Sequence, residues 1–328
     1  LSIPHHDFII DPLAIKDLDS LGQILADPQV EKIFHAAEYD IMLLKRQYKW
    51  QITNLFDTMW AARILGYKRY GLASLLKEIF GVHLDKRYQK SNWCKRPLSS
   101  DQLTYAQLDT HYLIPLRNHL AQQLQATGHM EEALETFDQQ TRVEPATNEF
   151  DPESFWSITG ARDLRPHQQA VLKALTIYRD HEARRRNKPH FKIMGDKTLL
   201  ELATKLPTNT HQLSQIYGMT NGQIRRYGQR LLQVIRDARK QPPPRQNRRN
   251  HHRPSEAITN RYEKLHEWRK KRARKRGVES DVIISRDALW AIARQNPQTL
   301  EELARLPELG KWRAKTYGEE ILAVLQNE

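Results

Sequence analysis

Three short segments in the first part of the sequence place carboxylates where they could serve metal-assisted hydrolysis. Asp40 lies in FHAAEYD, Asp57 in LFDT, and Asp109 follows Tyr105 in YAQLD. Hydrolysis of a phosphodiester commonly uses two divalent cations about 4 Å apart, and several elements must contribute carboxylates to hold them. Tyr105 and Asp109 are four residues apart, so on a helix they share one face. On this stretch alone, a polar rim on a buried helix explains the pair equally well.

The elements that would position these carboxylates follow an α/β pattern over roughly the first 125 residues. Lys32–Phe34 predicts a short strand that runs into a helix, and Asp57 stands at the start of another helix that ends at Gly66. Phe8–Ile10 is an apolar run typical of a buried strand. A chain whose first residues already belong to a core strand suggests further sequence before Leu1. We therefore expect an α/β domain that is incomplete at its amino end.

Asp40 and Asp109 are expected early on separate helices, next to strand ends, where open α/β sheets place their sites. Tyr105 would lie beside the metals. Its free pKa of about 10 makes it a poor base at neutral pH. Two roles therefore stay open: Tyr105 orients the attacking water, or it gives up its proton because the cations lower its pKa.

Composition limits the classes of protein to which the chain can belong. A length of 328 residues suggests two or three domains. The net charge of +13 favours a polyanionic partner, with nucleic acid the first candidate. Cys94 is the single cysteine, which excludes an internal disulfide and favours a reducing, cytoplasmic setting. No window approaches the roughly 18 apolar residues of a membrane span, and no obligate protein partner is evident.

An internal repeat occupies the second half of the chain, where strand signals nearly vanish. A shift of 90 residues aligns two segments without a gap; it places Leu199 over Leu289, Pro207 over Pro297, and Tyr227-Gly228 over Tyr317-Gly318. A constant offset through several helices predicts two copies of one helical module. The linker between them, QPPPRQNRRNHHRPSE, is rich in proline and basic residues.

The second copy opens with a dense run of cations, and the first copy repeats it more weakly. A charge run is ordinarily a solvated helix face, but acidic partners at i,i+4 are few here. Unbalanced cations on an exposed helix favour a phosphate-binding role. The candidate nucleic-acid-binding residues are Arg269, Lys270, Lys271, Arg272, Arg274, Lys275 and Arg276, together with Arg184, Arg185 and Arg186.

In chain order, KIFHAAEYDIMLL, LFDTMWAARILG, GLASLLKEIFG, KSNWCKRPLSSDQLTYAQLDTHYLIPL and the doubled module resemble bacterial ribonuclease D. The resemblance covers nearly the whole chain and is most specific from Trp93 to Leu116. It implies a ribonuclease H-like exonuclease domain of the DEDD superfamily, tyrosine subtype, followed by two all-α HRDC modules. It further implies 3′-to-5′ hydrolysis of RNA, with tRNA precursors and other small structured RNAs as substrates.

The resemblance also assigns roles to residues of this chain. Asp40 matches the aspartate of the family's second motif, and Tyr105 and Asp109 match its third, YxxxD. It implies that Asp40 and Asp109 hold two divalent cations, Mg²⁺ or Mn²⁺, and that Tyr105 positions the water. Arg96 belongs to the block before the third motif, where a substrate phosphate contact and a structural ion pair are equally good explanations.

The chain departs from the family pattern at the first motif, D-x-E, which the family carries on its first strand. The triplet Asp151-Pro152-Glu153 has this pattern, but it follows the exonuclease domain and is interpreted as a decoy. We therefore expect residues 1–328 to bind metals poorly and to be nearly inactive. Two rival functions stay open: a non-catalytic RNA-binding protein with a decayed site, and an exonuclease that acts on DNA.

The predicted division of the chain has five parts. They are the exonuclease domain (1–125), a helical connector (126–160), the first helical module (161–240), a linker (241–258) and the second helical module (259–328).

Overall fold

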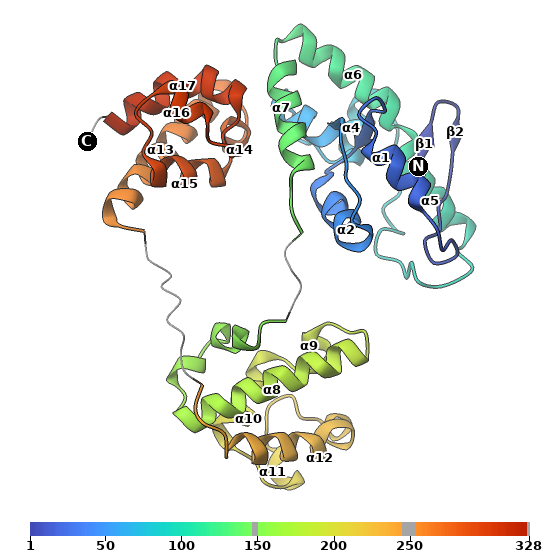
Figure 1. The fold of residues 1–328 in the computed structure, drawn as a ribbon. Helices are drawn as coiled ribbons and strands as arrows, with labels where there is room; N and C mark the ends of the chain where they lie inside the picture. Colours follow the sequence, from blue (N-terminus) through green and yellow to red (C-terminus); the bar gives the residue numbers. More distant parts are fainter. Residues whose placement is uncertain (146–149, 245–253, 327–328) are drawn as a thin grey trace. The chain divides into compact units, whose positions relative to one another are not determined.

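The computed structural model describes residues 1–145, 150–244 and 254–326 (Figure 1). The chain forms two compact units. Unit 1 joins Leu1–Ala146 to His252–Glu328, and unit 2 is Thr147–His251. Unit 2 has a hydrophobic core of its own, and unit 1 contains two cores. In the described part of the chain, no helix is both long and apolar enough to cross a membrane.

A small parallel sheet forms the centre of the amino-terminal part of unit 1. β3 (Lys32–Phe34) pairs with β4 (Leu55–Asp57), and Phe34 lies opposite Asp57. The crossover between the two strands runs through α2 (Glu38–Tyr48), as parallel pairing requires. All three residues of β4 are buried, because helices cover the sheet. The predicted strand at 32–34 and the helix that follows it are confirmed.

The helices that cover the sheet include one that precedes the strands in the sequence and several that follow them. α3 (Thr58–Ile64), α6 (Leu113–Ala126) and α7 (Met130–Thr141) pack on one another and on the strands, while α1 (Asp19–Ala26) and α4 (Leu72–Phe80) contribute to the same core. Asp57 caps α3, and Gly66, just beyond it, has a left-handed backbone with φ of 86°. The predicted start and end of this helix are confirmed.

The prediction that Phe8–Ile10 forms a buried strand is wrong. These residues follow a hairpin of two short strands, β1 (Ser2–Ile3) and β2 (His6–Asp7), and lie outside both. Phe8 is 47% exposed and Ile9 is 44% exposed. Phe8 exchanges two backbone hydrogen bonds with Leu1, but a buried strand also needs cover on its faces, and the exposure of Phe8 and Ile9 shows that this run lacks it.

The YxxxD segment and the apolar residues that follow it form two helices. α5 (Ser100–His111) is followed by its cap residue Tyr112, and α6 begins at Leu113. Pro115 explains the break, because it lacks the N–H that a continuous helix would bond to the carbonyl of His111. In the first turn of a new helix, backbone N–H groups have no acceptor within the helix, so a proline there removes no hydrogen bond. Tyr105 and Asp109 therefore lie on α5 alone.

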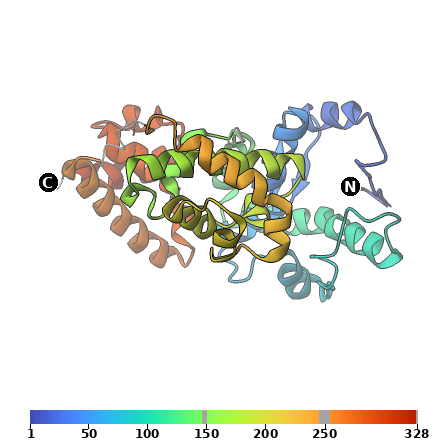
Figure 2. The same cartoon turned by 90° about the horizontal axis from the view of Figure 1, so that it is seen from below.

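The repeat is confirmed helix by helix. Each helix of the second copy begins 90 residues after its counterpart in the first. The pairs are α8 (Pro166–Arg185) with α13 (Glu256–Arg276), α9 (His190–Ile193) with α14 (Ser280–Ile283), α10 (Asp196–Lys205) with α15 (Arg286–Gln295), α11 (Thr210–Ser214) with α16 (Leu300–Ala304), and α12 (Asn221–Ala238) with α17 (Lys311–Gln326). Asn209 and Thr299 cap equivalent helices with their side chains. Within unit 2, α8 and α12 run side by side (Figure 1, Figure 2).

The predicted connector divides between the two units. α7 packs in unit 1, with Phe137 in its core, whereas Phe155 and Ile158 belong to the core of unit 2. Phe155 lies in a 3₁₀ helix, η1 (Pro152–Ser157), and Ile158 directly follows it. Of the predicted linker, residues 245–253 lie outside the described residues, and α13 already begins at Glu256.

Candidate active site

Asp40 lies in the first turn of α2, directly after the loop that leaves β3. In this loop Ala36 has a positive φ of 62°, which is uncommon for a residue with a side chain. The loop is held by Asp57 at the end of the neighbouring strand. The Asp57 carboxylate accepts the N–H of Ala36 at 3.1 Å and that of Ala37 at 2.8 Å. The position of Asp40 therefore depends on a carboxylate 17 residues further along the chain.

Asp57 itself serves the structure. It is fully buried, and its side chain also accepts the N–H groups of Met59 and Trp60 at the start of α3. Burial raises its pKa, while these backbone hydrogen bonds act in the opposite direction. With the Gln140 amide turned to satisfy both its groups, its nitrogen donates to Asp57 Oδ2 at 2.9 Å. Both oxygens of Asp57 therefore accept hydrogen bonds from the fold, which leaves Asp40 and Asp109 as the candidate metal ligands of the three carboxylates.

Tyr105 and Asp109 lie on α5, which begins with a reciprocal cap between Ser99 and Gln102. Asp40 is early on its helix, as predicted, but Asp109 is near the carboxyl end of α5. The structure nevertheless brings the two carboxylates together. Burial raises the pKa of Asp109, and the negative charge of Asp40 raises it further.

The two carboxylates form an electrostatically unsatisfied pair. Burial and the charge of Asp57 also raise the pKa of Asp40. Within the described residues, neither the Asp40 nor the Asp109 side chain forms a hydrogen bond or an ion pair, and both residues, although partly desolvated, keep solvent-exposed surface. Two hard oxygen donors without a cation fit the ligand preference of Mg²⁺ or Mn²⁺.

The fit to metal is partial. Among the described residues, no group of three or more acidic, histidine or cysteine side chains is placed to hold a metal ion. The two aspartates therefore supply only part of the ligand set that a two-cation site requires.

Tyr105 lies beside this pair. Burial raises the pKa of its hydroxyl, and the charge of Asp109 adds to the effect. The ring of Trp93 lies against it, with the two ring centroids 5.9 Å apart. Because the hydroxyl keeps its proton at neutral pH, it can donate a hydrogen bond to a water or a phosphate oxygen.

The amino-terminal hairpin supports α5 from the side, which sequence reasoning missed. Asp7 accepts hydrogen bonds from Gln107 at 2.8 Å and Ser2 at 2.5 Å, and its carboxylate lies 2.7 Å from His111 Nδ1. These contacts lower the pKa of Asp7 to about 2. The spacing of Gln107 and His111, four residues apart on the helix, was the available signal.

Two other sequence interpretations, those of Arg96 and of the triplet Asp151-Pro152-Glu153, can be compared with the structure, which also shows how His35 is placed. Arg96 forms the ion pair that was one of its two possible roles, with Nε and Nη2 at 2.7 and 2.6 Å from Asp11. His35 is a packed histidine, and burial lowers its pKa to about 4. In the D-x-E triplet, Asp151 caps η1 and Glu153 pairs with Lys173, all within unit 2.

The expectation that the basic run on α13 faces solvent is wrong at two positions. Arg269 is 7% exposed and donates to the carbonyl of Ile284 at 3.2 Å. Arg276 pairs with buried Glu132 of α7 at 2.7 Å and donates to the carbonyl of Ile64 at 3.0 Å. Both arginines hold the second module together or attach it to the exonuclease helices, so neither is available to a phosphate.

The expectation that acidic i,i+4 partners are few on the run of α13 agrees with the described residues, but the weaker run of α8 is paired throughout. Arg184 pairs with Asp180, and Arg185 and Arg186 both pair with Glu182. On α13, Lys270 pairs with Glu267 and Arg272 with Glu320. Among the described residues, the cations of the predicted set that are exposed and form no ion pair are Lys271, Arg274 and Lys275.

Comparison with known protein families agrees with this architecture. A family model described as 3′-5′ exonuclease matches residues 2–125, and the HRDC domain model matches residues 168–235 and again 259–325.

Comparison with individual proteins extends over the whole chain. Ribonuclease D of Gluconacetobacter diazotrophicus is 31% identical over 323 residues, which are 96% of this chain and 79% of that protein. Ribonuclease D of Granulibacter bethesdensis is 30% identical over 98% of this chain and 80% of its own. The crystal structure of Escherichia coli RNase D, described as an exoribonuclease involved in structured RNA processing, superposes with a TM-score of 0.65. It shares 26% identity and covers 96% of this chain and 84% of its own.

Proposed function

We propose a 3′-to-5′ exonuclease function for this chain, which belongs to the ribonuclease D family. The chain uses Asp40, Tyr105 and Asp109 to remove nucleotides from the 3′ ends of structured RNAs, tRNA precursors among them. The observation that carries the proposal is the pair formed by Asp40 and Asp109. The pKa of each carboxyl is raised, that of Asp109 in part by the charge of Asp40. Neither has a cationic partner in the described residues, and Tyr105 lies beside them. We expect the reaction to take place in the cytoplasm.

Asp40 and Asp109 would hold the divalent cations, which when bound supply positive charge at the scissile phosphate and favour ionisation of water. Tyr105 has a raised pKa and therefore acts as a hydrogen-bonding group, orienting the water for attack. The water oxygen bonds to phosphorus, and the bond from phosphorus to the 3′ oxygen breaks. That oxygen gains a proton, so the products are a nucleoside 5′-monophosphate and an RNA shorter by one nucleotide.

Residues 1–328 contribute two carboxylates of this site, and their two D-x-E triplets, which begin at Asp151 and Asp180, belong to unit 2. We expect these 328 residues by themselves to bind the cations weakly and to trim RNA slowly or not at all. The exposed cations Lys271, Arg274 and Lys275 on α13 would add affinity for RNA that does not depend on its sequence and falls with salt.

The test is exonuclease activity on a 3′-labelled tRNA with an added tail, in Mg²⁺ and in Mn²⁺. Residues 1–328 are compared with the same chain extended upstream to the nearest start codon, and each is also made with Asp109→Asn. We expect the extended chain to release labelled nucleoside monophosphate. We expect the substitution to slow it by at least about 100-fold, because it removes a charged metal ligand.

Two results would contradict the proposal. If neither chain trims RNA but both bind it in a salt-sensitive manner, the protein is a non-catalytic RNA binder. If the extended chain trims single-stranded DNA faster than RNA, the enzyme acts on DNA.

A further inference from the structure

The exposed face of α12, in the first helical module, carries a row of cations that the basic runs in the sequence did not reveal. Arg225, Arg226, Arg230 and Arg236 are all exposed, and Lys240 continues the row just beyond the helix. Arg226, Arg230 and Arg236 lie within about 120° of the circumference of the helix, which rises about 5.4 Å per turn. The only acidic residue of α12 is Asp237.

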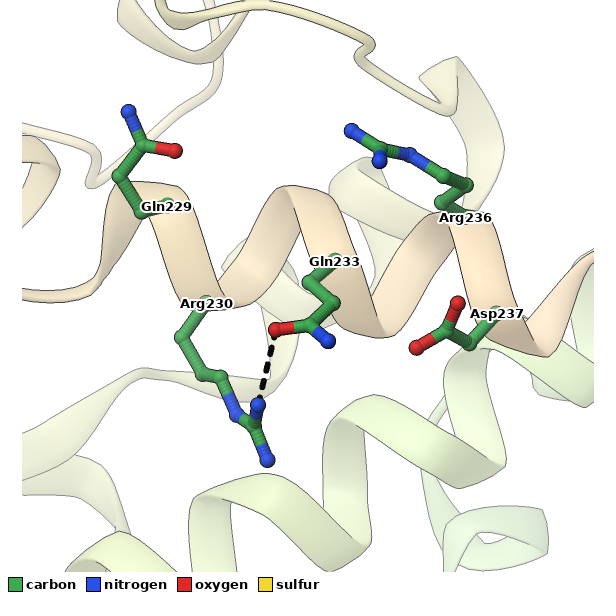
Figure 3. A pocket seen from close by; sticks show the side chains of 5 residues that line it. All are labelled: Gln229, Arg230, Gln233, Arg236 and Asp237. Carbon is green, nitrogen blue, oxygen red and sulfur yellow. Dashed lines mark hydrogen bonds between the residues drawn. The ribbon is translucent and has the colours of Figure 1, made fainter.

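Two shallow hollows follow this face and meet at Arg236. The first, of about 400 Å³, is formed by α12 alone. Figure 3 shows Gln229 and Arg236 on one side of it, Arg230 and Asp237 on the other, and Gln233 between them. Arg230 donates to Gln233 Oε1 at 2.8 Å. This hollow offers guanidinium and amide donors, which are the groups that bind phosphate oxygens.

The second hollow, of about 460 Å³, combines an apolar floor with a cationic rim. Pro207, Leu232 and Ile235 contribute the floor, while Arg236, Arg239 and Lys240 contribute the rim. An apolar surface bordered by cations suits a nucleotide, whose base or ribose contacts the floor while its phosphate contacts the rim.

These cations are available, in contrast to those of α8. In the described part of the chain, Arg225, Arg226, Arg236 and Lys240 form no ion pair, and neither does Arg239. Like charges grouped on one helix face repel one another. A polyanion relieves this repulsion and releases its own counterions on binding.

The second copy of the module provides an internal comparison. The helix equivalent to α12 is α17, and the counterparts of the exposed residues Arg225, Arg226, Arg230 and Arg236 are exposed there too. There, Thr316, Glu320 and Gln326 replace Arg226, Arg230 and Arg236. Glu320 accepts a hydrogen bond from Trp268 Nε1 at 2.9 Å and pairs with Arg272. The cationic face is therefore a feature of the first copy and is not required by the module's fold.

The second copy uses its surface for a different purpose. Glu279 and Asp281 pair with Arg63 of the exonuclease helices, and Arg313 pairs with Glu135 of α7. The first copy carries Pro189, Phe191 and Gln223 at the positions of Glu279, Asp281 and Arg313. Those residues cannot form the same ion pairs. The two copies have thus diverged, one towards attachment within unit 1 and the other towards a cationic surface.

We infer that the α12 face, defined by Arg226, Arg230, Arg236, Arg239 and Lys240 with the floor at Leu232 and Ile235, binds the backbone of a single RNA strand. Successive phosphates contact the arginines along the helix, and one base or ribose covers the apolar floor. The inference rests on the proposed function only in naming RNA as the polyanion. Binding itself requires neither the metals nor the carboxylate pair.

The test measures binding of a fluorescein-labelled single-stranded 12-nucleotide RNA to the full 328-residue chain, by fluorescence anisotropy in EDTA across a salt series. The variant combines Arg226→Thr, Arg230→Glu and Arg236→Gln, which are the residues that the same fold already carries in its second copy. The control combines Arg162→Thr, Lys188→Glu and Lys192→Gln. These three positions are exposed cations of unit 2 outside the α12 face, and the change in net charge is the same.

We expect the α12 variant to bind RNA at least about 10-fold more weakly and its salt slope to fall by about 2, since each phosphate contact on a single strand contributes about 0.7. The control should keep the wild-type slope, and circular dichroism should show both variants folded. Wild-type affinity and slope in the α12 variant would overturn the inference. So would equal displacement of RNA by polyglutamate, which would identify an acidic protein segment as the occupant.

These measurements stand apart from catalysis. If the upstream-extended chain binds RNA through α12 but never trims it, the proposed function alone is contradicted. A chain that trims RNA while the α12 variant binds normally contradicts this inference alone.

Discussion

At the residue scale, two kinds of carboxylate lie close together and serve different ends. Asp57 is buried and accepts four backbone N–H groups, which join β4 to the loop before α2 and to the start of α3. The side-chain carboxylates of Asp40 and Asp109 accept no hydrogen bond in the described residues, and both residues keep solvent-exposed surface. The first kind fixes geometry, and the second kind is free to bind a cation.

Asp57→Asn should destabilise the protein by about 2–3 kcal/mol, because an amide NH₂ would face N–H donors that now meet a carboxylate oxygen. Urea denaturation measures the effect. Asp27→Asn is the matched control, since Asp27 accepts one N–H in an exposed turn. Equal stability of the Asp57 variant and the wild type would show that the clamp is dispensable.

The carboxylate pair predicts a dependence on pH. The pKa values of Asp40 and Asp109 are raised above their unfolded values, so the folded chain binds protons at these carboxyls more tightly than the unfolded chain. Their contribution to stability is therefore highest at low pH and falls as pH rises through the raised pKa. In EDTA at pH 7, Asp109→Asn should therefore raise Tm by about 1–3 °C, a small effect because solvent screens the pair.

At about pH 4 the difference between Asp109→Asn and the wild type should shrink, and Mg²⁺ should stabilise the wild type but not the variant. Differential scanning fluorimetry at both pH values measures this. A variant less stable than the wild type at pH 7 in EDTA would contradict the repulsion.

At the scale of elements, the amino end of α17 approaches α7 closely. Glu135 accepts the N–H of Trp312 at 2.6 Å and that of Arg313 at 3.3 Å, which satisfies donors that a helix start leaves unpaired. Gly310 makes this approach possible, because a Cβ there would lie 2.3 Å from the Glu135 carboxyl carbon. Its φ of 87° also favours glycine.

Gly310→Ala should cost about 2 kcal/mol or more, whereas Gly277→Ala should cost about 1 kcal/mol. Both glycines have positive φ, but a Cβ at Gly277 would meet nothing within 4 Å. The difference between the two variants in urea denaturation isolates the contact with Glu135. Equal costs would mean that backbone strain alone accounts for both.

At the scale of the whole molecule, unit 1 and unit 2 have separate hydrophobic cores. The core of unit 2 is built from residues 155–238, whereas Val278 and Val282 of the second module pack with the exonuclease core. Separate cores unfold as separate cooperative units when few interactions couple them.

Calorimetry of the full chain should therefore resolve two transitions. Residues 150–244, produced alone, should fold and reproduce one of the two, with the helical circular dichroism of the first module. A single transition in the full chain, together with an unfolded 150–244 fragment, would show that the two units depend on each other.

The sequence by itself determined the features that arise from local or periodic patterns. The strand at Lys32–Phe34, the helix start at Asp57 and the repeat of 90 residues each depend on propensity, capping or a constant spacing, and the structure confirms them. Resemblance to a family supplied the roles of Asp40, Tyr105 and Asp109, which no local pattern determines.

Only the tertiary structure decided which charged groups are occupied and which are free. Arg276 belongs to the densest basic run, yet it pairs with Glu132, 144 residues away in the sequence. Arg226 and Arg230 lie outside the dense basic runs of the sequence, yet both are exposed on one face of α12. Phe8 and Ile9 are apolar, yet both side chains are exposed because no other element covers them in the described residues. A side chain's type sets which partners it can take, and long-range packing decides which of those partners it meets.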